Sequence, residues 1–423
     1  MAKIVETNQV KADQQTRLIA DLVRAFQKKQ VALGARLAPL AIASRDMVEL
    51  VGAVASLAQT ELDGLIVPSE RLTIEVRDNL LAKGYHLLHL TEGTVTPPEQ
   101  VVPPRRGRIC LQTSGTTGVP KIIEHTWQTL FTMSKLREFK PQNWLVTYQA
   151  GTYAWYQMLT LALFVPGQSL TLPRERDPVR AIEAALQHEV TAISGTPTFW
   201  RMAFLQFSAT TLQALPLRQI TLGGERVDQV ILDRLQSLYP AATVTHIYAS
   251  TEAGACIIVR DGREGFPIAW LAANGQASAS DERPVLQVRD GTLWIRSPHA
   301  AVDQAEWINS GDAAEIRGDR VFILGREDKS IINVGGIKVA ACDVERRILE
   351  HPSVLWCRVY GRKAPLLGQL VASDVVFRPA AVTATEAELA HFCNQHLPEY
   401  MVPRVWNFLD TIPTTDNLKT PVT

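Results

Sequence analysis

The residues best suited to chemistry form a short run of glycine, hydroxyl and lysine side chains, TSGTTGVPK, at positions 113–121. The run follows directly after RICLQ, an apolar segment that is typical of a buried strand. Its glycines let the backbone approach anionic oxygens without a Cβ in the way, and its hydroxyl groups lie beside the backbone N–H groups. This composition predicts a phosphate-binding loop; a solvated turn is the alternative interpretation. The predicted phosphate-binding residues are Thr113, Ser114, Gly115, Thr116, Thr117, Gly118 and Lys121.

The spacing of this run is not that of a Walker loop, GxxxxGK[ST]. The whole nonapeptide instead resembles the signature of the adenylate-forming superfamily, which contains acyl- and aryl-CoA synthetases, peptide-synthetase adenylation domains and luciferases. The resemblance implies an ATP-dependent ligase that joins a carboxylic acid to AMP, releases pyrophosphate, and then passes the acyl group to a thiol. The sequence leaves open whether that thiol is coenzyme A or the phosphopantetheine arm of an acyl or peptidyl carrier protein.

Two later segments resemble the family's adenosine-binding motifs. Gly223, Gly224 and Glu225 follow a strand-like run and are similar to the segment that lines one face of the adenine. The segment WINSGD ends at Asp312 and is similar to W-x-x-T-G-D, which implies that this aspartate accepts hydrogen bonds from both ribose hydroxyls. Arg326 matches the arginine of the family's G-R-x-D, which the resemblance also places at the ribose.

The residues implied at the phosphates come from two other segments. YASTE, which begins at Tyr248, is similar to the family's Y-G-x-T-E. The match implies that the tyrosine stacks on adenine, that Thr251 faces the α-phosphate, and that Glu252 coordinates Mg²⁺. PTTDNLKT resembles P-R-T-x-N-G-K and puts Lys419 where the family's lysine bridges the substrate carboxylate and the α-phosphate. Leu418 stands where the family usually has glycine.

The family rotates a small C-terminal domain between its two half-reactions, and the matching segments are present here. Asp328 or Lys329 is the implied hinge, because one extra residue leaves the register open. The segment around Gly336 is implied to line the thiol-binding face. We therefore expect a large AMP-binding domain over residues 1–324 and a small mobile domain over residues 325–423.

The acid-binding pocket is expected where aromatic segments approach the glycine pair. Aromatic walls suit an aryl or medium acyl acid, although plain core packing explains the same residues equally well. The segment TYAWY has no aspartate, which the family's amino-acid activators usually carry there, so an α-amino acid is disfavoured. The predicted pocket residues are Tyr153, Trp155, Thr196, Phe199 and Gly223.

Two other functions stay open at this point. Each later motif alone has an ordinary structural interpretation, such as a core aromatic, a turn residue or a surface charge, so the resemblance depends on their order along the chain. One alternative is an adenylate-forming ligase with an amine acceptor. The other is a nucleotide-binding regulator impaired in turnover, which the short N-terminal part and Leu418 would fit.

The elements that must position these residues follow from hydrophobic periodicity. Between residues 107 and 249, apolar β-prone runs alternate with helical segments, which predicts a mostly parallel sheet covered by helices. From Arg283 onward, short strands and tight turns such as Asp290-Gly291 predict a small β-rich subdomain, followed by an α+β unit. In the N-terminal part, helical spacing of apolar residues predicts helices over 16–27, 45–59 and 69–83.

Bulk composition fits an enzyme of this kind. At 423 residues with 46% hydrophobic and 20% charged residues, the chain can bury more than one core. Its 43 basic and 43 acidic residues balance, so no overall field favours nucleic acid or a membrane surface. No signal peptide or membrane-spanning segment is predicted, and five scattered cysteines are typical of reduced thiols. We expect a cytoplasmic enzyme that acts on a small carboxylic acid, with no nucleic-acid or membrane partner.

Overall fold

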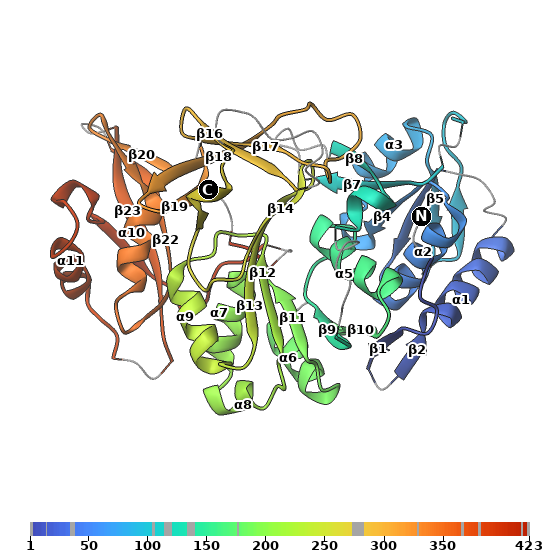
Figure 1. Cartoon of the computed structure of the whole chain (residues 1–423), viewed down its shortest axis with the longest axis horizontal. Coiled ribbons are helices and arrows are strands. Elements are labelled where there is room, and N and C mark those ends of the chain that lie inside the picture. The colour runs from blue at the N-terminus through green and yellow to red at the C-terminus, as the bar shows by residue number, and fades with distance from the viewer. Residues whose placement is uncertain are drawn as a thin grey trace.

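The N-terminal part, the middle and the C-terminal part of the chain lie side by side in this computed structural model (Figure 1). None of the helices in the described part of the chain is long and apolar enough to cross a membrane. The structure describes residues 3–13, 15–33, 39–103, 106–113, 121–132, 140–175, 177–272, 283–327, 330–364, 368–379, 382–415 and 418–420.

A six-stranded sheet lies in the N-terminal part, and its last two strands flank the predicted phosphate loop. Its four central strands are parallel, and the two edge strands are antiparallel to their neighbours. In spatial order the strands are β6 (Thr94–Thr96), β5 (His86–His89), β3 (Leu40–Ser44), β4 (Gly64–Pro68), β7 (Arg108–Thr113) and β8 (Lys121–Thr126).

An eight-stranded sheet forms the middle of the molecule. Its strands from β13 to β1 are parallel, while β14 and β2 are antiparallel edge strands. The strand order is β14 (Gly254–Val259), β13 (Thr243–Ser250), β12 (Gln219–Gly223), β11 (Ala192–Gly195), β9 (Gln142–Val146), β10 (Gln168–Leu172), β1 (Gln9–Ala12) and β2 (Gln15–Leu18).

Helices cover both sheets in layers. Trp144 and Val146 of β9 belong to one core and Leu145 to the next, the alternation expected of a strand buried on both faces. The core shared by the two sheets includes α1 (Ile19–Ala32), α2 (Met47–Thr60), α4 (Trp127–Leu130) and α5 (Tyr153–Phe164). The outer faces are covered by α3 (Ile74–Ala82) on the six-stranded sheet, and by α6 (Pro178–Gln187), α7 (Pro197–Gln206), α8 (Ala209–Gln213) and α9 (Gln229–Leu238) on the eight-stranded sheet.

The predicted β-rich subdomain is an antiparallel five-stranded sheet. Asp290 and Gly291 both have positive φ, 50° and 75°, and join two paired strands, so the predicted hairpin turn is confirmed. The strand order is β15 (Phe266–Pro267), β19 (Arg320–Arg326), β18 (Ile308–Arg317), β17 (Thr292–Arg296) and β16 (Val285–Arg289).

Residues 330–420 form what we call the C-terminal unit. The chain leaves β19 at Arg326 and enters the sheet of this unit at Ile331, so the change of sheet falls between these residues. Independent movement of the unit stays a prediction. Its elements are β20 (Ile331–Val334), β21 (Ile337–Ala340), α10 (Ala341–Leu349), β22 (Val354–Ala364), β23 (Gly368–Phe377), α11 (Glu386–Asn394) and β24 (Val405–Phe408).

The predicted α/β fold is confirmed, with one correction in the N-terminal part. Three expected helices are present, but they share this part with β1 to β6, which we had not expected. The runs that form β3 and β4, LAIAS and GLIVP, are buried on both faces and therefore lack the alternation that marks a half-buried strand. All five cysteines are free and buried.

Candidate active site

The carboxyl ends of three neighbouring parallel strands bring the predicted motifs together. Strands β11, β12 and β13 are adjacent, with Gly195 opposite Leu222 and Gly223 opposite Ile247. The segments that follow them begin at Thr196, Gly224 and Thr251 and therefore lie at one edge of the sheet. This is where open α/β sheets usually bind ligands.

The three residues predicted at the adenosine lie in contact although they are far apart in sequence. Tyr248 donates a hydrogen bond of 2.5 Å from its hydroxyl to Oδ2 of Asp312. Arg326, the β-sheet partner of Asp312, approaches Oδ1 at 3.7 Å with Nε and donates from Nη1 to the Ser310 carbonyl at 2.7 Å. Burial, and then the Asp312 carboxylate, raise the pKa of Tyr248, so its hydroxyl stays protonated as a donor.

The two ends of the predicted phosphate loop are paired across an antiparallel ladder. Thr113 of β7 lies opposite Lys121 of β8, so the loop leaves and re-enters the sheet at one point. The loop residues Ser114, Gly115, Thr116, Thr117 and Gly118 lie outside the described residues.

A histidine that the sequence analysis missed connects this hairpin to the segment of Thr251 and Glu252. His125 on β8 is fully buried, and its Nε2 donates to the Thr251 carbonyl oxygen at 2.7 Å, while Nδ1 lies 2.9 Å from Oγ1 of Thr129. Burial lowers the pKa of His125 to about 4, although the bond to Thr251 opposes the shift, so the imidazole is neutral near pH 7. No spacing rule marks His125 in the sequence, because its partner is 126 positions away.

Glu252, the predicted magnesium ligand, lies in the turn between β13 and β14. Its side chain is partly buried, and its backbone carbonyl accepts a hydrogen bond of 2.8 Å from the Ala301 N–H. Across the residues that the structure describes, no group of three or more His, Cys, Asp or Glu side chains is arranged to hold a metal ion.

Lys419 reaches the edge of the sheet from the opposite end of the chain. A Cβ placed on Gly224 would lie 3.0 Å from Cε and 3.3 Å from Nζ of Lys419, so the absence of a side chain at Gly224 makes room for the lysine. Burial lowers the pKa of Lys419; the charge of Glu225 opposes this shift, and that of Arg71 adds to it. Arg71, in the short helix η1 (Ser69–Arg71), was not singled out from the sequence.

The residue before this lysine adopts an unusual backbone conformation. Leu418 has φ of 51°, in the left-handed region, which costs a non-glycine residue roughly 1–2 kcal/mol. Its side chain is only 8% exposed and belongs to the core of α6, α7 and α9. Burying a leucine side chain contributes about 1.5–3 kcal/mol, which offsets the backbone cost.

The predicted pocket residues differ in their surroundings. Tyr153 is buried, and its hydroxyl accepts a hydrogen bond of 2.9 Å from the Ala255 N–H. Thr196 caps α7 by accepting from the Phe199 N–H at 3.0 Å. Trp155 and Phe199 have no exposed surface, which favours the core interpretation for these two.

Tyr148, which was not predicted, lies beside the glycine pair. Its hydroxyl is 3.7 Å from the position of a Cβ on Gly223 and 3.2 Å from Oγ of Ser194. Burial raises the pKa of Tyr148 to about 12, against the effect of the Ser194 hydrogen bond. Tyr148 therefore places an aromatic side chain beside Gly223, where we expect the acid-binding pocket.

The residues predicted to serve domain movement lie in the C-terminal unit or just before it. Asp328 and Lys329, the hinge candidates, lie outside the described residues. Gly336 is exposed in the turn between β20 and β21, with φ of 91°, and its N–H donates to Oδ1 of Asn333 at 2.9 Å.

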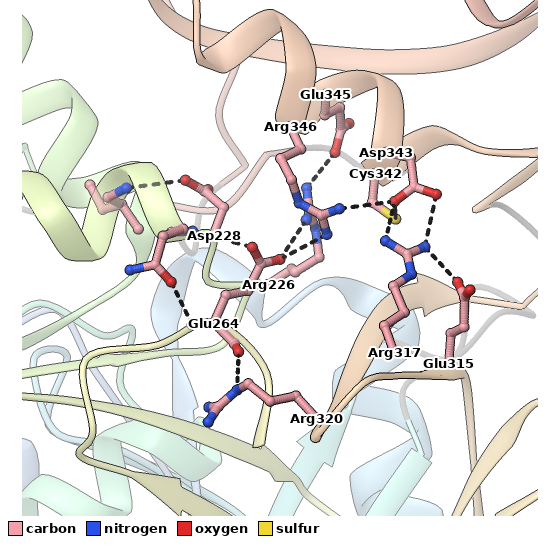
Figure 2. A network of polar contacts seen from close by, with 12 residues as sticks. Arg226, Asp228, Glu264, Glu315, Arg317, Arg320, Cys342, Asp343, Glu345 and Arg346 are labelled. Carbon is pink, nitrogen blue, oxygen red and sulfur yellow. Dashed lines mark hydrogen bonds and ion pairs between the residues drawn. The ribbon is translucent and has the colours of Figure 1, made fainter. Parts of the chain in front are cut away.

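Ion pairs connect the C-terminal unit to the rest of the chain, as Figure 2 shows. Arg226, in the segment after β12, pairs with Glu345 of α10 at 2.7 Å and with Glu264 at 3.3 Å. Glu264 is also 3.6 Å from Arg346 of α10. The interface network, as we call it, consists of Arg226, Glu264, Arg317, Asp343, Glu345 and Arg346.

Two family models match this chain. The family model described as AMP-binding enzyme matches residues 40–302, and the model described as AMP-binding enzyme C-terminal domain matches residues 343–419. The chain belongs to the AMP-binding enzymes. The second match contains Lys419, and the first contains the predicted phosphate loop. The predicted membership of the adenylate-forming superfamily is therefore confirmed.

Relatives of this AMP-binding enzyme include acid–CoA ligases and peptide synthetases. It is 26% identical to a feruloyl-CoA synthase from Amycolatopsis sp. over 339 residues, which cover 74% of this chain and 68% of that protein. It is 25% identical to gramicidin S synthase 2 from Brevibacillus brevis over 411 residues, which cover 88% of this chain and 9% of that protein.

Solved structures show the same fold. The anthranilate CoA ligase AuaEII, in complex with anthranoyl-AMP, superposes with a TM-score of 0.74 at 17% identity, covering 99% of this chain and 93% of that one. The o-succinylbenzoate coenzyme A synthetase of Bacillus subtilis, in complex with ATP and magnesium ion, has a TM-score of 0.69 at 20% identity, covering 99% and 95%. The family and the relatives together confirm the predicted class, an AMP-forming acid–thiol ligase.

Proposed function

We propose that this AMP-binding enzyme converts a carboxylic acid and ATP into an acyl-adenylate and pyrophosphate, and then transfers the acyl group to the thiol of coenzyme A. The observation that carries the proposal is the position of Lys419, which is partly buried beside Gly224 at the carboxyl ends of parallel strands. A preorganised cation at this place suits a reaction between two anions, a carboxylate and the α-phosphate of ATP.

The described residues fit the adenosine part of ATP. The Asp312 carboxylate can accept from both ribose hydroxyls, and Arg326 lies close enough to hold that carboxylate in place. Tyr248 supplies an aromatic ring for the adenine, and its hydroxyl is fixed by the bond to Asp312. Thr113 and Lys121 stand at the two ends of the loop to which we assign the phosphates.

Magnesium fits the same end of the site. Mg²⁺ usually binds proteins through one or two carboxylates together with substrate phosphates, and Glu252 offers one carboxylate beside Thr251. When bound, the ion neutralises phosphate charge. His125 holds the Thr251 backbone, so we propose that it orients this part of the site without touching the substrate.

In the first half-reaction, the carboxylate oxygen of the acid attacks the α-phosphorus and pyrophosphate leaves. Lys419 lies between the two anions in this proposal and reduces their repulsion. In the second half-reaction, the thiolate attacks the acyl carbonyl carbon and AMP leaves with the electron pair of the broken C–O bond. We propose that rotation of the C-terminal unit about Asp328 or Lys329 withdraws Lys419 and brings the segment of Gly336 to the acyl-adenylate.

The substrate is proposed to be an aryl acid or a medium acyl acid. Tyr148 and Tyr153 give the sheet edge an aromatic lining, and the relatives named for ferulate and anthranilate act on aryl acids. A carrier-protein thiol stays the second choice of acceptor, because a peptide synthetase is among the relatives. The buried, free cysteines support a cytoplasmic location.

Acid-dependent exchange between pyrophosphate and ATP tests the proposal. A panel of benzoates, cinnamates, medium-chain acids and amino acids is assayed first for exchange, and then for AMP release with coenzyme A or pantetheine-loaded carrier protein. We expect exchange with at least one aryl or medium acyl acid and a thioester with coenzyme A. Nucleotide binding without exchange for any acid would favour the regulator, and a product formed only with amines would favour the amine-acceptor alternative.

A further inference from the structure

The segment that carries Lys419 is attached to the sheet edge on both sides of the lysine. On one side, the Leu418 carbonyl accepts a hydrogen bond of 2.5 Å from Oγ1 of Thr196. The Leu418 side chain is buried in a core made mostly by the large part of the chain, which we define as the described residues up to 327, together with Leu355 of β22. On the other side, Thr420 donates from its N–H and from Oγ1 to Oε1 of Glu225, at 2.7 and 3.0 Å. Lys419 therefore has little freedom to leave the site while these contacts persist.

Glu225 connects this segment to α7. Its second carboxylate oxygen, Oε2, accepts from the N–H of Thr198 at 3.1 Å, in the first turn of the helix that Thr196 caps. The carboxylate thus accepts three hydrogen bonds, one from α7 and two from Thr420. The resemblance implies that the glycine–glycine–glutamate segment lines the adenine, but here the charged end of Glu225 faces the Lys419 segment.

Leu418 adds a contact that a glycine could not make. A glycine would adopt its left-handed conformation without cost but would bury no side chain. With leucine at this position, the strained backbone persists only while the side chain stays in the core of the large part. Undocking relieves the strain and exposes the side chain, so the docked position of Lys419 is stabilised by burial.

We propose that Glu225 and Leu418 are positioning residues, which together with Thr196 and Thr420 form a latch that holds Lys419 in place for adenylate formation. This inference rests on the proposed function. The hydrogen bonds from Thr196 to Leu418 and from Thr420 to Glu225 join the Lys419 segment to the large part of the chain, so the latch must open before the C-terminal unit can rotate. Weakening it lowers the rate of adenylation and leaves acyl transfer to the thiol unimpaired.

The test compares Leu418→Ala and Glu225→Gln with the conservative control Leu418→Met, all in the full-length chain. Leu418→Ala removes the buried side chain and keeps the backbone strain, whereas methionine refills the same space. Glu225→Gln replaces one acceptor oxygen by an NH₂ group that faces an N–H donor. For both test variants we expect kcat of pyrophosphate exchange to fall at least about tenfold, with KM for ATP little changed; tenfold corresponds to about 1.4 kcal/mol.

Transfer from a synthetic acyl-adenylate to coenzyme A distinguishes a positioning role from a purely structural one, because a folding defect would slow this half-reaction as well. We expect it to proceed at least at the wild-type rate in both variants, and we expect Leu418→Met to exchange close to the wild type. Equal loss of both half-reactions would assign the two residues to folding. Wild-type exchange in both variants would overturn the latch.

Lysine acetylation followed by mass spectrometry tests the latch without using activity. Lys419 should react slowly in the wild type and about tenfold faster in Leu418→Ala, relative to the exposed Lys338 in the same unit. Lys419 that reacts equally in both proteins would contradict the latch even if the wild type catalyses exchange. Absence of exchange in the wild type, with protection of Lys419 as expected, would instead contradict the proposed function.

Discussion

Removing Arg226 from the interface network should favour one half-reaction over the other. Arg226 joins Glu264 of the large part to Glu345 of α10, and the side chains are only 19%, 8% and 18% exposed. Any rotation of the C-terminal unit separates Arg226 from Glu345. The pair with Glu264 lies within the large part and is lost in both orientations, so only the pair with Glu345 makes a difference between them. We therefore expect Arg226→Met to destabilise the orientation seen here, in which Lys419 lies at the sheet edge, relative to the rotated orientation.

The magnitude follows from the partners that remain. Breaking a buried ion pair by removing one partner costs about 3–5 kcal/mol. Glu264 still accepts a hydrogen bond from the Gln229 N–H at 3.3 Å, and Glu345 accepts one from the Val359 N–H at 3.0 Å. Each remaining carboxylate therefore keeps a hydrogen-bond donor. We expect about 2 kcal/mol, below that range, because these hydrogen bonds remain and the side chains keep some access to solvent. This corresponds to about a thirtyfold change in the orientation equilibrium.

The assay measures pyrophosphate exchange and single-turnover transfer from a preformed acyl-adenylate on the same preparations. Arg263→Met is the matched control, because Arg263 forms a bidentate pair with Asp319 that lies within the large part and is mostly exposed. Exposed pairs contribute about 0–1 kcal/mol, so this control should change neither rate. If Arg226→Met slows both half-reactions equally, or neither, the network does not set the orientation.

Four further predictions concern the proposed site. Lys419→Ala should nearly abolish pyrophosphate exchange but spare ATP binding and transfer from a preformed adenylate; equal loss of both half-reactions would contradict its assigned role. Asp312→Ala should weaken ATP binding by about 1.5–3 kcal/mol, the contribution of hydrogen bonds to a charged group, and an unchanged Kd by calorimetry would exclude the ribose contact. Arg71→Gln should move the alkaline limb of the exchange rate to higher pH, because the protonated lysine is the active form and Arg71 lowers the pKa of Lys419. A pH profile without this shift would show that Arg71 does not influence Lys419. A proline at the hinge fixes φ near −65°, so Asp328→Pro or Lys329→Pro should impair thioester formation far more than exchange, and wild-type rates in both variants would place the hinge elsewhere.

The sequence singled out site candidates where a local motif marks them. Tyr248, Asp312 and Arg326 were selected from three separate motifs, and the structure brings them into contact. Gly224 was selected because its segment resembles the one that lines the adenine, and the structure places Lys419 in the space that its missing side chain leaves. In each case a short motif that resembles one of the family's motifs marks the residue.

Residues that act through distant partners could not be found in this way. His125 is linked to Thr251 across 126 positions, and Arg226 to Glu345 across 119, so no local pattern distinguishes either from an ordinary core or surface residue. Leu418 was noticed only as a departure from glycine. Its packing in the core of α6, α7 and α9 is a property of the tertiary structure.

The burial of the five cysteines has a consequence for an enzyme that makes an acylating agent. A reactive thiolate close to an acyl-adenylate would capture the acyl group and inactivate the protein by self-acylation. Cys256 is near enough to Tyr248 to influence its pKa, yet burial raises the pKa of its own thiol to about 12, so it stays protonated and unreactive. Burial likewise raises the pKa of Cys342 and Cys393 to about 11. The thiol that enters the site from solution is therefore the one that reacts with the activated acid.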